Sequence, residues 1–421
     1  MSDSPIVTEN PLAARVRTFA PPQAITPDVF VHPMFVNTYA LKTSDGLVLI
    51  DPGTGAGSQS VHQAVRGWSD APLRTAIYTH GHADHAFGLR AFLKAGERPR
   101  IIAQENCVAR FRRYQLTHGW NARINQRQFS LPLPLFPQRF DWPTVTFRDA
   151  LTESHGDVEL QLRAARGETD DHCWVWVPQR RYLFTGDLII WMAPNCGNPQ
   201  KVQRYPAEWA QVLEEMAALE PEWLFPGHGL VVQGREAVHQ VLTETARYLR
   251  VIIDQVLVRM NAGETPEQIF HAVEPDPELA TRPYLRARYD HPKFIVRNLL
   301  RLWGGWWNGN AADLLPAKAE AQAVEIVALA GGVSAVIRRG RELLAQSQLE
   351  LAAHCAEWAT RAEPLDRAAQ ALKRDVYEAR LATEESLMAK GIFRAAANDA
   401  RAVLGEEPLA AQTMLSLGAE S

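Results

Sequence analysis

The stretch Thr79-His80-Gly81-His82-Ala83-Asp84-His85 places three histidines and one aspartate within six residues, at the end of the apolar run Thr75–Thr79. A turn at a strand end can direct His80 and His82 towards one point while Asp84 and His85 reach a second point close by. Imidazole and carboxylate groups are ligands that suit zinc, with manganese and iron as alternatives. Because four such groups would pack poorly without partners, the cluster predicts a metal site.

The sequence around this cluster has the pattern of a mixed αβ domain. From about residue 29 to 230, short apolar runs alternate with polar or Gly/Pro-containing segments. They predict strands at Val29–Val31, Phe35–Leu41, Gly46–Ile50, Thr75–Thr79, Val158–Ala164, Cys173–Val177 and Tyr182–Phe184. Helices fit between them, for example Ser58–Trp68 and Ala86–Lys94. Strands mixed with helices indicate a layered αβ architecture.

The pattern changes to helical periodicity after about Gly234. Helices are predicted at Val238–Arg259, Pro266–Ala272, Pro292–Trp303 and Ala317–Ala330. The segment Gly332–Leu404 predicts antiparallel helical hairpins with breaks near Pro364 and Gly391. We therefore predict an αβ catalytic domain over residues 1–235, a helical domain over 236–408 and a flexible tail over 409–421.

Length and composition narrow the class of protein. With 421 residues the chain predicts two or three domains. Its net charge of −4 argues against a constitutive nucleic-acid binder. We see no signal peptide and no run of about 18 apolar residues, so we expect a cytoplasmic enzyme without a membrane partner. The four cysteines are scattered and predict neither a disulfide framework nor a zinc cluster.

The HxHxDH pattern of residues 80–85 resembles the signature of the metallo-β-lactamase superfamily, and further motifs follow in the expected order. Asp51 resembles the first motif, which implies that it supports the metal loop from behind. Asp187 resembles the fourth, a carboxylate shared between two metals, and His228 resembles the fifth, a ligand of the second metal. The resemblance implies an αββα sandwich with a two-metal centre, followed here by the all-helical domain.

The third motif departs from the superfamily pattern. Most members have Gly-His-Thr there, whereas this chain reads Gly167-Glu168-Thr169-Asp170-Asp171-His172. We favour Glu168 as the ligand because it occupies the motif position, and its added negative charge would hold a dication tightly. His172 is the alternative ligand or a donor behind the site. His155 is a weaker candidate for a role facing the substrate.

A glutamate at this position is a feature of the alkylsulfatases, and the spacing from Glu168 to Asp187 resembles theirs. Residues 105–106 and 125–129 resemble the segment between their first two ligand groups. The run 302–310, with its three tryptophans, is similar to a segment of their dimerisation domain, and residues 328–345 resemble its continuation. The resemblance implies a sulfate-ester hydrolase that acts on a small anionic ester and forms a homodimer.

Several family features are altered in this chain. We expect no counterpart of the C-terminal domain of sterol-carrier type, and Asp187 stands where the family has glutamate. The sulfate-binding arginine of the family has no clean counterpart within Trp191–Arg204, and Lys201 and Arg204 are the candidates to replace it. His291 is the nearest match, a few residues out of register, for a histidine that holds sulfate or protonates the leaving group.

The resemblance gives each candidate residue a role. Two zinc ions, with manganese or iron as alternatives, would be held by His80, His82, Asp84, His85, Glu168, Asp187 and His228. Catalytic roles fall to Asp84, Asp187 and His291, where His291 would protonate the departing alcohol if attack falls on sulfur; attack on carbon is equally open. Substrate contacts are assigned to Lys201, Arg204 and Trp191, the last together with Met192.

Other functions remain open from the sequence. Trp303, Trp306 and Trp307 fit a core or subunit interface, and alternatively an apolar wall for an alkyl chain. The chemistry could be hydrolysis of a lactone, thioester or phosphodiester, or that of an iron-dependent oxidoreductase on the same fold. A non-enzymatic helical interaction module is disfavoured by the nearly complete set of ligands.

Overall fold

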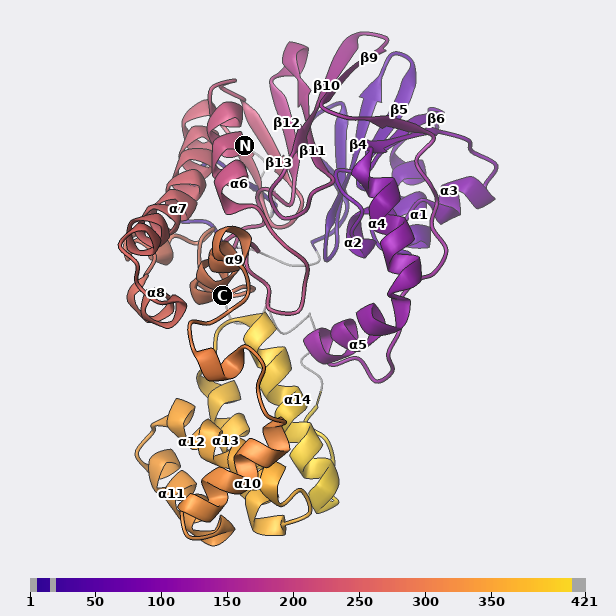
Figure 1. Cartoon of the computed structure of the whole chain (residues 1–421). Coiled ribbons are helices and arrows are strands. Elements are labelled where there is room, and N and C mark those ends of the chain that lie inside the picture. Colours follow the sequence, from indigo (N-terminus) through magenta and orange to yellow (C-terminus); the bar gives the residue numbers. More distant parts are fainter. Residues whose placement is uncertain (1–5, 16–19, 411–421) are drawn as a thin grey trace.

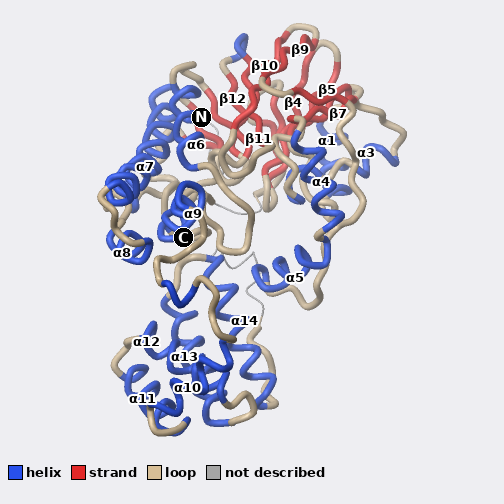
Figure 2. The backbone as a smooth tube through the Cα atoms, viewed as in Figure 1, coloured by secondary structure: helices blue, strands red, loops and turns tan. Residues whose placement is uncertain are grey.

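Two seven-stranded β-sheets pack face to face in the computed structural model, which describes residues 6–15 and 20–410 (Figures 1 and 2). The first sheet has the order β2-β3-β4-β5-β6-β7-β8. Its strands are β2 (Gln23–Ala24), β3 (Val29–Pro33), β4 (Asn37–Thr43), β5 (Gly46–Ile50), β6 (Leu73–Ile77), β7 (Arg100–Gln104) and β8 (Val145–Phe147).

The second sheet has the order β1-β14-β13-β12-β11-β10-β9. Its strands are β1 (Val7–Thr8), β9 (Ala150–His155), β10 (Val158–Ala165), β11 (His172–Val177), β12 (Tyr182–Gly186), β13 (Trp223–Pro226) and β14 (Val231–Gln233). Residues such as Ile77, Leu160 and Phe184 fill the space between the sheets. Most of the predicted strands are therefore present, with ends shifted by a few residues.

Helices cover the outer faces of both sheets (Figure 1). The first sheet is covered by α1 (Ser58–Trp68), α2 (Ala83–Ala86), α3 (Arg90–Lys94) and α4 (Asn106–Leu116), whose apolar residues form one cluster with its strands. The second sheet is covered by α6 (Pro206–Ala217) and α7 (Arg235–Asn261). The αββα arrangement confirms the predicted fold class, and α5 (His118–Phe129) extends from α4 away from the sheets.

The topology brings strand ends of both sheets together at one edge. β5 and β6 run parallel in the first sheet, and β12 and β13 run parallel in the second. Loops that follow the carboxyl ends of neighbouring parallel strands are the usual place for a ligand site in open αβ sheets. Four of the five motif loops that the sequence singles out leave such ends, and the loop with Glu168 follows β10, which pairs antiparallel with its neighbours.

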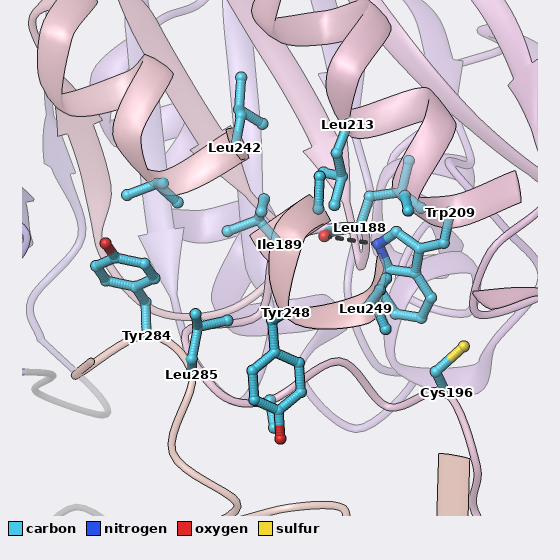
Figure 3. Close-up of a cluster of buried hydrophobic side chains, with 14 of the residues drawn as sticks. Leu188, Ile189, Cys196, Trp209, Leu213, Leu242, Tyr248, Leu249, Tyr284 and Leu285 are labelled. Carbon is cyan, nitrogen blue, oxygen red and sulfur yellow. Dashed lines mark hydrogen bonds between the residues drawn. The ribbon is translucent and has the colours of Figure 1, made fainter. Parts of the chain in front are cut away.

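A large hydrophobic cluster joins α7 to the sandwich (Figure 3). It contains Trp209 of α6, Leu249 of α7 and Leu299 of α9 (Pro292–Gly304), with α8 (Pro266–Ala272) packed nearby. The Trp209 indole donates a hydrogen bond of 3.0 Å to the carbonyl of Leu188. The domain boundary near residue 235 stays a prediction: α7 begins there, but it shares this cluster with the αβ part.

The last five helices lie at the other end of the molecule (Figure 1). They are α10 (Ala319–Leu329), α11 (Val333–Ala345), α12 (Leu349–Ala362), α13 (Arg367–Thr383) and α14 (Leu387–Leu404), arranged as helical hairpins as predicted. A small hydrophobic cluster joins helices α10 to α13, and α14 packs against α13. The chain breaks near Pro364 as expected. Of the predicted flexible tail, residues 411–421 lie outside the described segments.

The predicted break near Gly391 is wrong, because Gly391 lies inside α14. A Cβ atom there would meet the backbone oxygen of Gln128 at 2.8 Å, so glycine at this position lets α14 pack directly on α5. Among helices of the described segments, none alone is long and apolar enough to span a membrane. Only α10 and α11 together reach that length and composition, and they are bent by 88°.

Candidate metal centre

The loop after β6 carries the first four candidate ligands. His82 has an extended backbone and immediately precedes α2, whose single turn holds Asp84 and His85. His80 and His85 are fully buried, whereas His82 and Asp84 are half-buried. This change from strand to helix within a few residues directs the side chains to two neighbouring points, as the spacing predicts.

The first group of candidate ligand atoms comes from His80, His82, Glu168 and Asp187, all within 4.8 Å of one another. Oε2 of Glu168 lies 3.3 Å from Nε2 of His80 and 3.2 Å from Nδ1 of His82. Oδ2 of Asp187 lies 3.9 Å from Nε2 of His80. This set of two imidazoles and two carboxylates is of the type that binds zinc.

The second group comes from Asp84, His85 and His228. Oδ2 of Asp84 lies 3.6 Å from Nε2 of His85 and 3.5 Å from Nε2 of His228. Oδ1 of Asp187 lies 3.1 Å and 3.2 Å from the same two nitrogens. One oxygen of Asp187 therefore faces each group, as expected for a carboxylate shared between two metals.

Three histidines are held from behind, so that Nε2 faces the site. Nδ1 of His85 lies 2.8 Å from Oδ2 of Asp51, and Nδ1 of His80 lies 3.1 Å from the Thr79 hydroxyl. Nδ1 of His228 is hydrogen bonded to the backbone carbonyl of Phe35. Partners of this kind fix the ring orientation and tautomer of metal-binding histidines.

Asp51 connects two of these supports. Its carboxylate accepts hydrogen bonds from the Thr79 backbone at 2.8 Å and from the Thr79 hydroxyl at 2.7 Å, besides its contact with His85. Burial alone would raise the pKa of Asp51, but His85 outweighs it and lowers the pKa. Asp51 therefore lies behind the metal residues, in the place that the resemblance implies.

The residues present fit a metal centre on independent grounds. Buried atoms without a hydrogen-bond partner in the described segments include Nε2 of His85, Oε2 of Glu168 and Oδ1 of Asp187, all of which face the two groups. Such atoms are rare in proteins unless an ion or ligand completes them. Burial lowers the pKa of His82 to about 4, so this imidazole is neutral at pH 7 and able to bind a metal.

Glu168, rather than His172, belongs to the first group. Nε2 of His172 accepts a hydrogen bond of 3.2 Å from the Asp187 backbone, and its ring stacks on His80 at 4.8 Å. Burial lowers the pKa of His172 to about 3, so it is a neutral support behind the site. His155 lies in the β9–β10 hairpin and does not line the cavity at the metal centre.

Arg204 neutralises Glu168. Its guanidinium lies 2.6 Å from Oε1 of Glu168 and donates to the carbonyl of Asn195 at 3.1 Å, while the Asn195 amide also donates to Oε1. Burial would raise the pKa of Glu168, but His82 and Arg204 keep it well below its ordinary value. The extra negative charge expected at the third motif is thus balanced, and Arg204 is committed to Glu168.

A second buried ion pair holds the metal loop, and the sequence did not reveal it. Asp171 accepts a hydrogen bond of 2.9 Å from the Gly81 backbone and one of 2.7 Å from Nε of Arg110. Arg110 also donates to Asp170 at 2.6 Å. Glu168 and Asp171 therefore have different tasks, one towards the ions and the other towards the loop between His80 and His82.

The loops of the two sheets meet closely at Asp187. A Cβ atom on Gly227 would lie 2.2 Å from Oδ1 of Asp187, so any larger residue would displace this carboxylate. The backbone N–H of Gly227 in turn donates a hydrogen bond of 2.8 Å to the carbonyl of Gly186. This close approach brings His228 next to Asp187.

A cavity of about 380 Å³ opens on both groups. Its wall is mostly apolar and includes Phe35, Phe87, Phe129, Phe136, Ile190 and Met192. Lys201 lies in the same wall, 3.3 Å from Oδ1 of Asn125. Among the described lining residues, Lys201 is the only lysine or arginine that is not paired with a carboxylate.

Two predicted positions do not line this cavity. Trp191 is buried in the hydrophobic cluster with α7, and its indole N–H donates a hydrogen bond of 2.6 Å to the carbonyl of Leu230. Its backbone φ of 57° turns the side chain away, so Ile190 and Met192 face the cavity instead. His291 lines a separate cavity and accepts a hydrogen bond from the Lys293 backbone at the start of α9, whereas Tyr289 reaches the metal cavity.

Comparisons with known proteins agree with this arrangement. Residues 32–228 match the family model described as the metallo-beta-lactamase superfamily, and residues 265–402 match that described as alkyl sulfatase dimerisation. A linear primary-alkylsulfatase from Pseudomonas sp. is 28% identical over 361 residues, which cover 79% of this chain and 68% of that protein. An (R)-specific secondary-alkylsulfatase from Pseudomonas sp. is 24% identical over 376 residues, covering 81% of this chain and 56% of that protein.

A solved structure has the same fold. The stereoselective inverting sec-alkylsulfatase Pisa1 from Pseudomonas sp. superposes with a TM-score of 0.81 at 21% sequence identity, covering 89% of this chain and 65% of that chain. The chain thus spans between about half and two thirds of the length of these relatives. Residues 32–228 of this chain are therefore a region of the metallo-β-lactamase superfamily type, and residues 265–402 are a region of the alkyl-sulfatase dimerisation type.

Proposed function

We propose that the chain is a metal-dependent hydrolase of sulfate esters whose alcohol part is apolar. The observation that carries this proposal is Asp187, which presents one oxygen to each of two ligand groups at the end of an apolar cavity. Two zinc ions held there would supply Lewis-acid catalysis and a nucleophile at neutral pH. Metal analysis of the purified protein tests zinc against manganese and iron.

The chain's own residues would bind and orient the ester. Lys201 faces the anionic head, because it is the unpaired cation of the described cavity wall. The aromatic and aliphatic side chains hold the alcohol part and exclude water from it. Burial of each methylene contributes about 0.8 kcal/mol, or roughly a fourfold gain in kcat/KM per carbon until the cavity is filled.

The decisive experiment is hydrolysis by the zinc-loaded protein of a primary and a secondary alkyl sulfate, an aryl sulfate, a lactone and a phosphodiester. Metal-dependent release of sulfate, lost in His82→Ala, is the expected result. Turnover of only the lactone or the phosphodiester would discard sulfate esters as the substrate. That alternative is favoured by one observation, because neither Arg204 nor His291 is free to hold sulfate.

The pH dependence should report on Lys201. Burial and Arg204 lower the pKa of Lys201 to about 8. Because only the protonated amine attracts an anion, kcat/KM for an anionic ester should fall as the pH rises through about 8. Lys201→Arg should move this fall to higher pH, since arginine keeps its charge. The lactone, being neutral, is the control; an equal fall for both substrates would exclude Lys201.

We also propose that the protein is a homodimer. The dimerisation match covers α8 to α14. Trp303 at the end of α9 and Trp306 and Trp307 just after it are exposed by 40%, 73% and 45% in the single chain. Exposed tryptophans of this kind are typical of subunit contacts. Light scattering should give twice the chain mass of 47.0 kDa, and Trp306→Ser should lower it. A monomer mass for the unaltered protein would contradict this proposal.

The predicted cytoplasmic location is retained as a proposal that cell fractionation can test.

A further inference from the structure

A hydrogen-bonded pair in the wall of the metal cavity has no role in the chemistry described so far. Nε2 of Gln128, on α5, donates to the hydroxyl of Tyr289, which precedes α9, at 2.9 Å. Both residues line the cavity together with His82, Asp84 and Asp187. The two residues are 161 positions apart in the chain, so their contact depends on the complete fold.

This pair presents an unused hydrogen-bond donor to the cavity. When the Gln128 amide donates, the Tyr289 proton has no acceptor among the described residues, and Oε1 of Gln128 is buried without a partner. If the amide is turned over, Tyr289 donates to Oε1 and the amide N–H groups are left free instead. The first arrangement, in which Gln128 donates, leaves the Tyr289 proton as the donor for an oxygen of a bound ligand.

The backbone of Tyr289 is fixed by the start of α14. Its carbonyl accepts hydrogen bonds from the Ser386 hydroxyl at 3.0 Å and from the Met388 backbone at 3.1 Å. α14 also packs on α5 through Gly391, beside Gln128. Both members of the pair are therefore held by the same helix, which is the preorganisation that a catalytic hydrogen bond requires.

The surroundings of Tyr289 favour its protonated form. Burial raises the pKa of the Tyr289 hydroxyl well above its ordinary value. The side chain is thus a neutral donor at neutral pH. It complements Lys201, whose charge suits the anionic head of the ester.

We propose that Tyr289 is a catalytic residue whose hydroxyl donates a hydrogen bond to the ester oxygen that departs with the alcohol, and that Gln128 positions it. This inference rests on the proposed function. As water attacks sulfur, a new S–O bond forms, the old S–O bond breaks and its electron pair passes to the alcohol oxygen. That oxygen takes its proton from the attacking water, while Tyr289 stabilises the developing charge and keeps its own proton.

Removal of the hydroxyl in Tyr289→Phe should depend on the leaving group. An alkyl sulfate, whose alcohol leaves poorly, should lose about 100-fold in kcat, whereas 4-nitrophenyl sulfate should lose less than about 5-fold. Gln128→Leu should also slow the alkyl sulfate more than 4-nitrophenyl sulfate, with a loss of about 10-fold in kcat on the alkyl sulfate. The control is Tyr182→Phe, whose hydroxyl contacts Asp28 away from the cavity and whose loss should alter neither rate.

The outcomes separate this inference from a structural role and from the proposed function. Zinc content and the thermal midpoint should be unchanged in Tyr289→Phe. Equal losses on both sulfates, or none, would overturn the assignment although sulfatase activity stands.

If the unaltered protein hydrolyses no sulfate, the proposed function fails. In that case, calorimetry of 1-octanol binding tests the Tyr289 hydrogen bond, because the oxygen of 1-octanol takes the place of the oxygen of the departing alcohol. Binding about 10-fold weaker in Tyr289→Phe would support the hydrogen bond, and equal binding would overturn it.

Discussion

Replacement of Asp187 by alanine is expected to remove at least one metal ion and to lower kcat by about a thousandfold or more. This carboxylate contacts both groups, through Oδ1 to His85 and His228 and through Oδ2 to His80. Metal ions contribute several kcal/mol of transition-state stabilisation, which corresponds to about that factor. Elemental analysis and steady-state rates at saturating zinc measure the two effects.

The matched control is Asp254→Ala, because Asp254 is an exposed carboxylate on α7. It removes the same side chain without touching the site, so both zinc content and rate should stay unchanged. An Asp187→Ala protein that retains about two ions per chain and a rate within tenfold of the original would show that the groups do not depend on this residue. The shared role of Asp187 would then be wrong.

Replacement of Arg110 by methionine should cost about 3–5 kcal/mol of stability, because Asp171 would remain buried without its partner. The thermal midpoint should fall by roughly 10 °C. Burial would raise the pKa of Asp171, and at present Arg110 holds that pKa below its ordinary value. Without Arg110 the folded-state pKa of Asp171 should rise above its unfolded value, so protonation at lower pH would favour the folded protein. The loss of stability caused by Arg110→Met should therefore be smaller at pH 5 than at pH 8, as measured on the metal-free protein.

A double variant separates the structural from the catalytic task of this pair. Arg110→Met combined with Asp171→Leu removes both charges and should recover part of the lost stability. It also removes the acceptor of the Gly81 backbone N–H, so activity should remain about 10–100-fold low. Full recovery of activity in the double variant would show that Asp171 does not hold the metal loop.

The residues of the metal groups could be predicted from the sequence because their geometry is local. His80 to His85 occupy one strand end and one helical turn, and Asp187 and His228 each follow a buried apolar strand by one or two residues. The order of these strands then brings the loops together without further information. The glutamate at position 168 was preferred on register alone, and the structure places it with His80 and His82.

The cavity wall could not be predicted in the same way. A backbone φ of 57° at Trp191 exchanges which neighbours face the cavity, and a strand pattern does not reveal such a turn. Arg110 and Asp171 pair across 61 residues, and Gln128 and Tyr289 pair across 161 residues. The periodicity of helices and strands does not predict contacts between residues so far apart in the sequence. α4 and α5 were missed as helices as well, so the wall that they form was not anticipated.

The hold of α14 on Tyr289 has a consequence for the order of events during synthesis. All seven residues of the metal groups have been synthesised once position 228 is made, together with both sheets except β14. The contacts from Ser386 and Met388 to Tyr289 form only about 160 residues later. The metal residues are therefore synthesised before the helix that completes the cavity wall around Tyr289. We expect that metal loading can precede the ability to bind substrate.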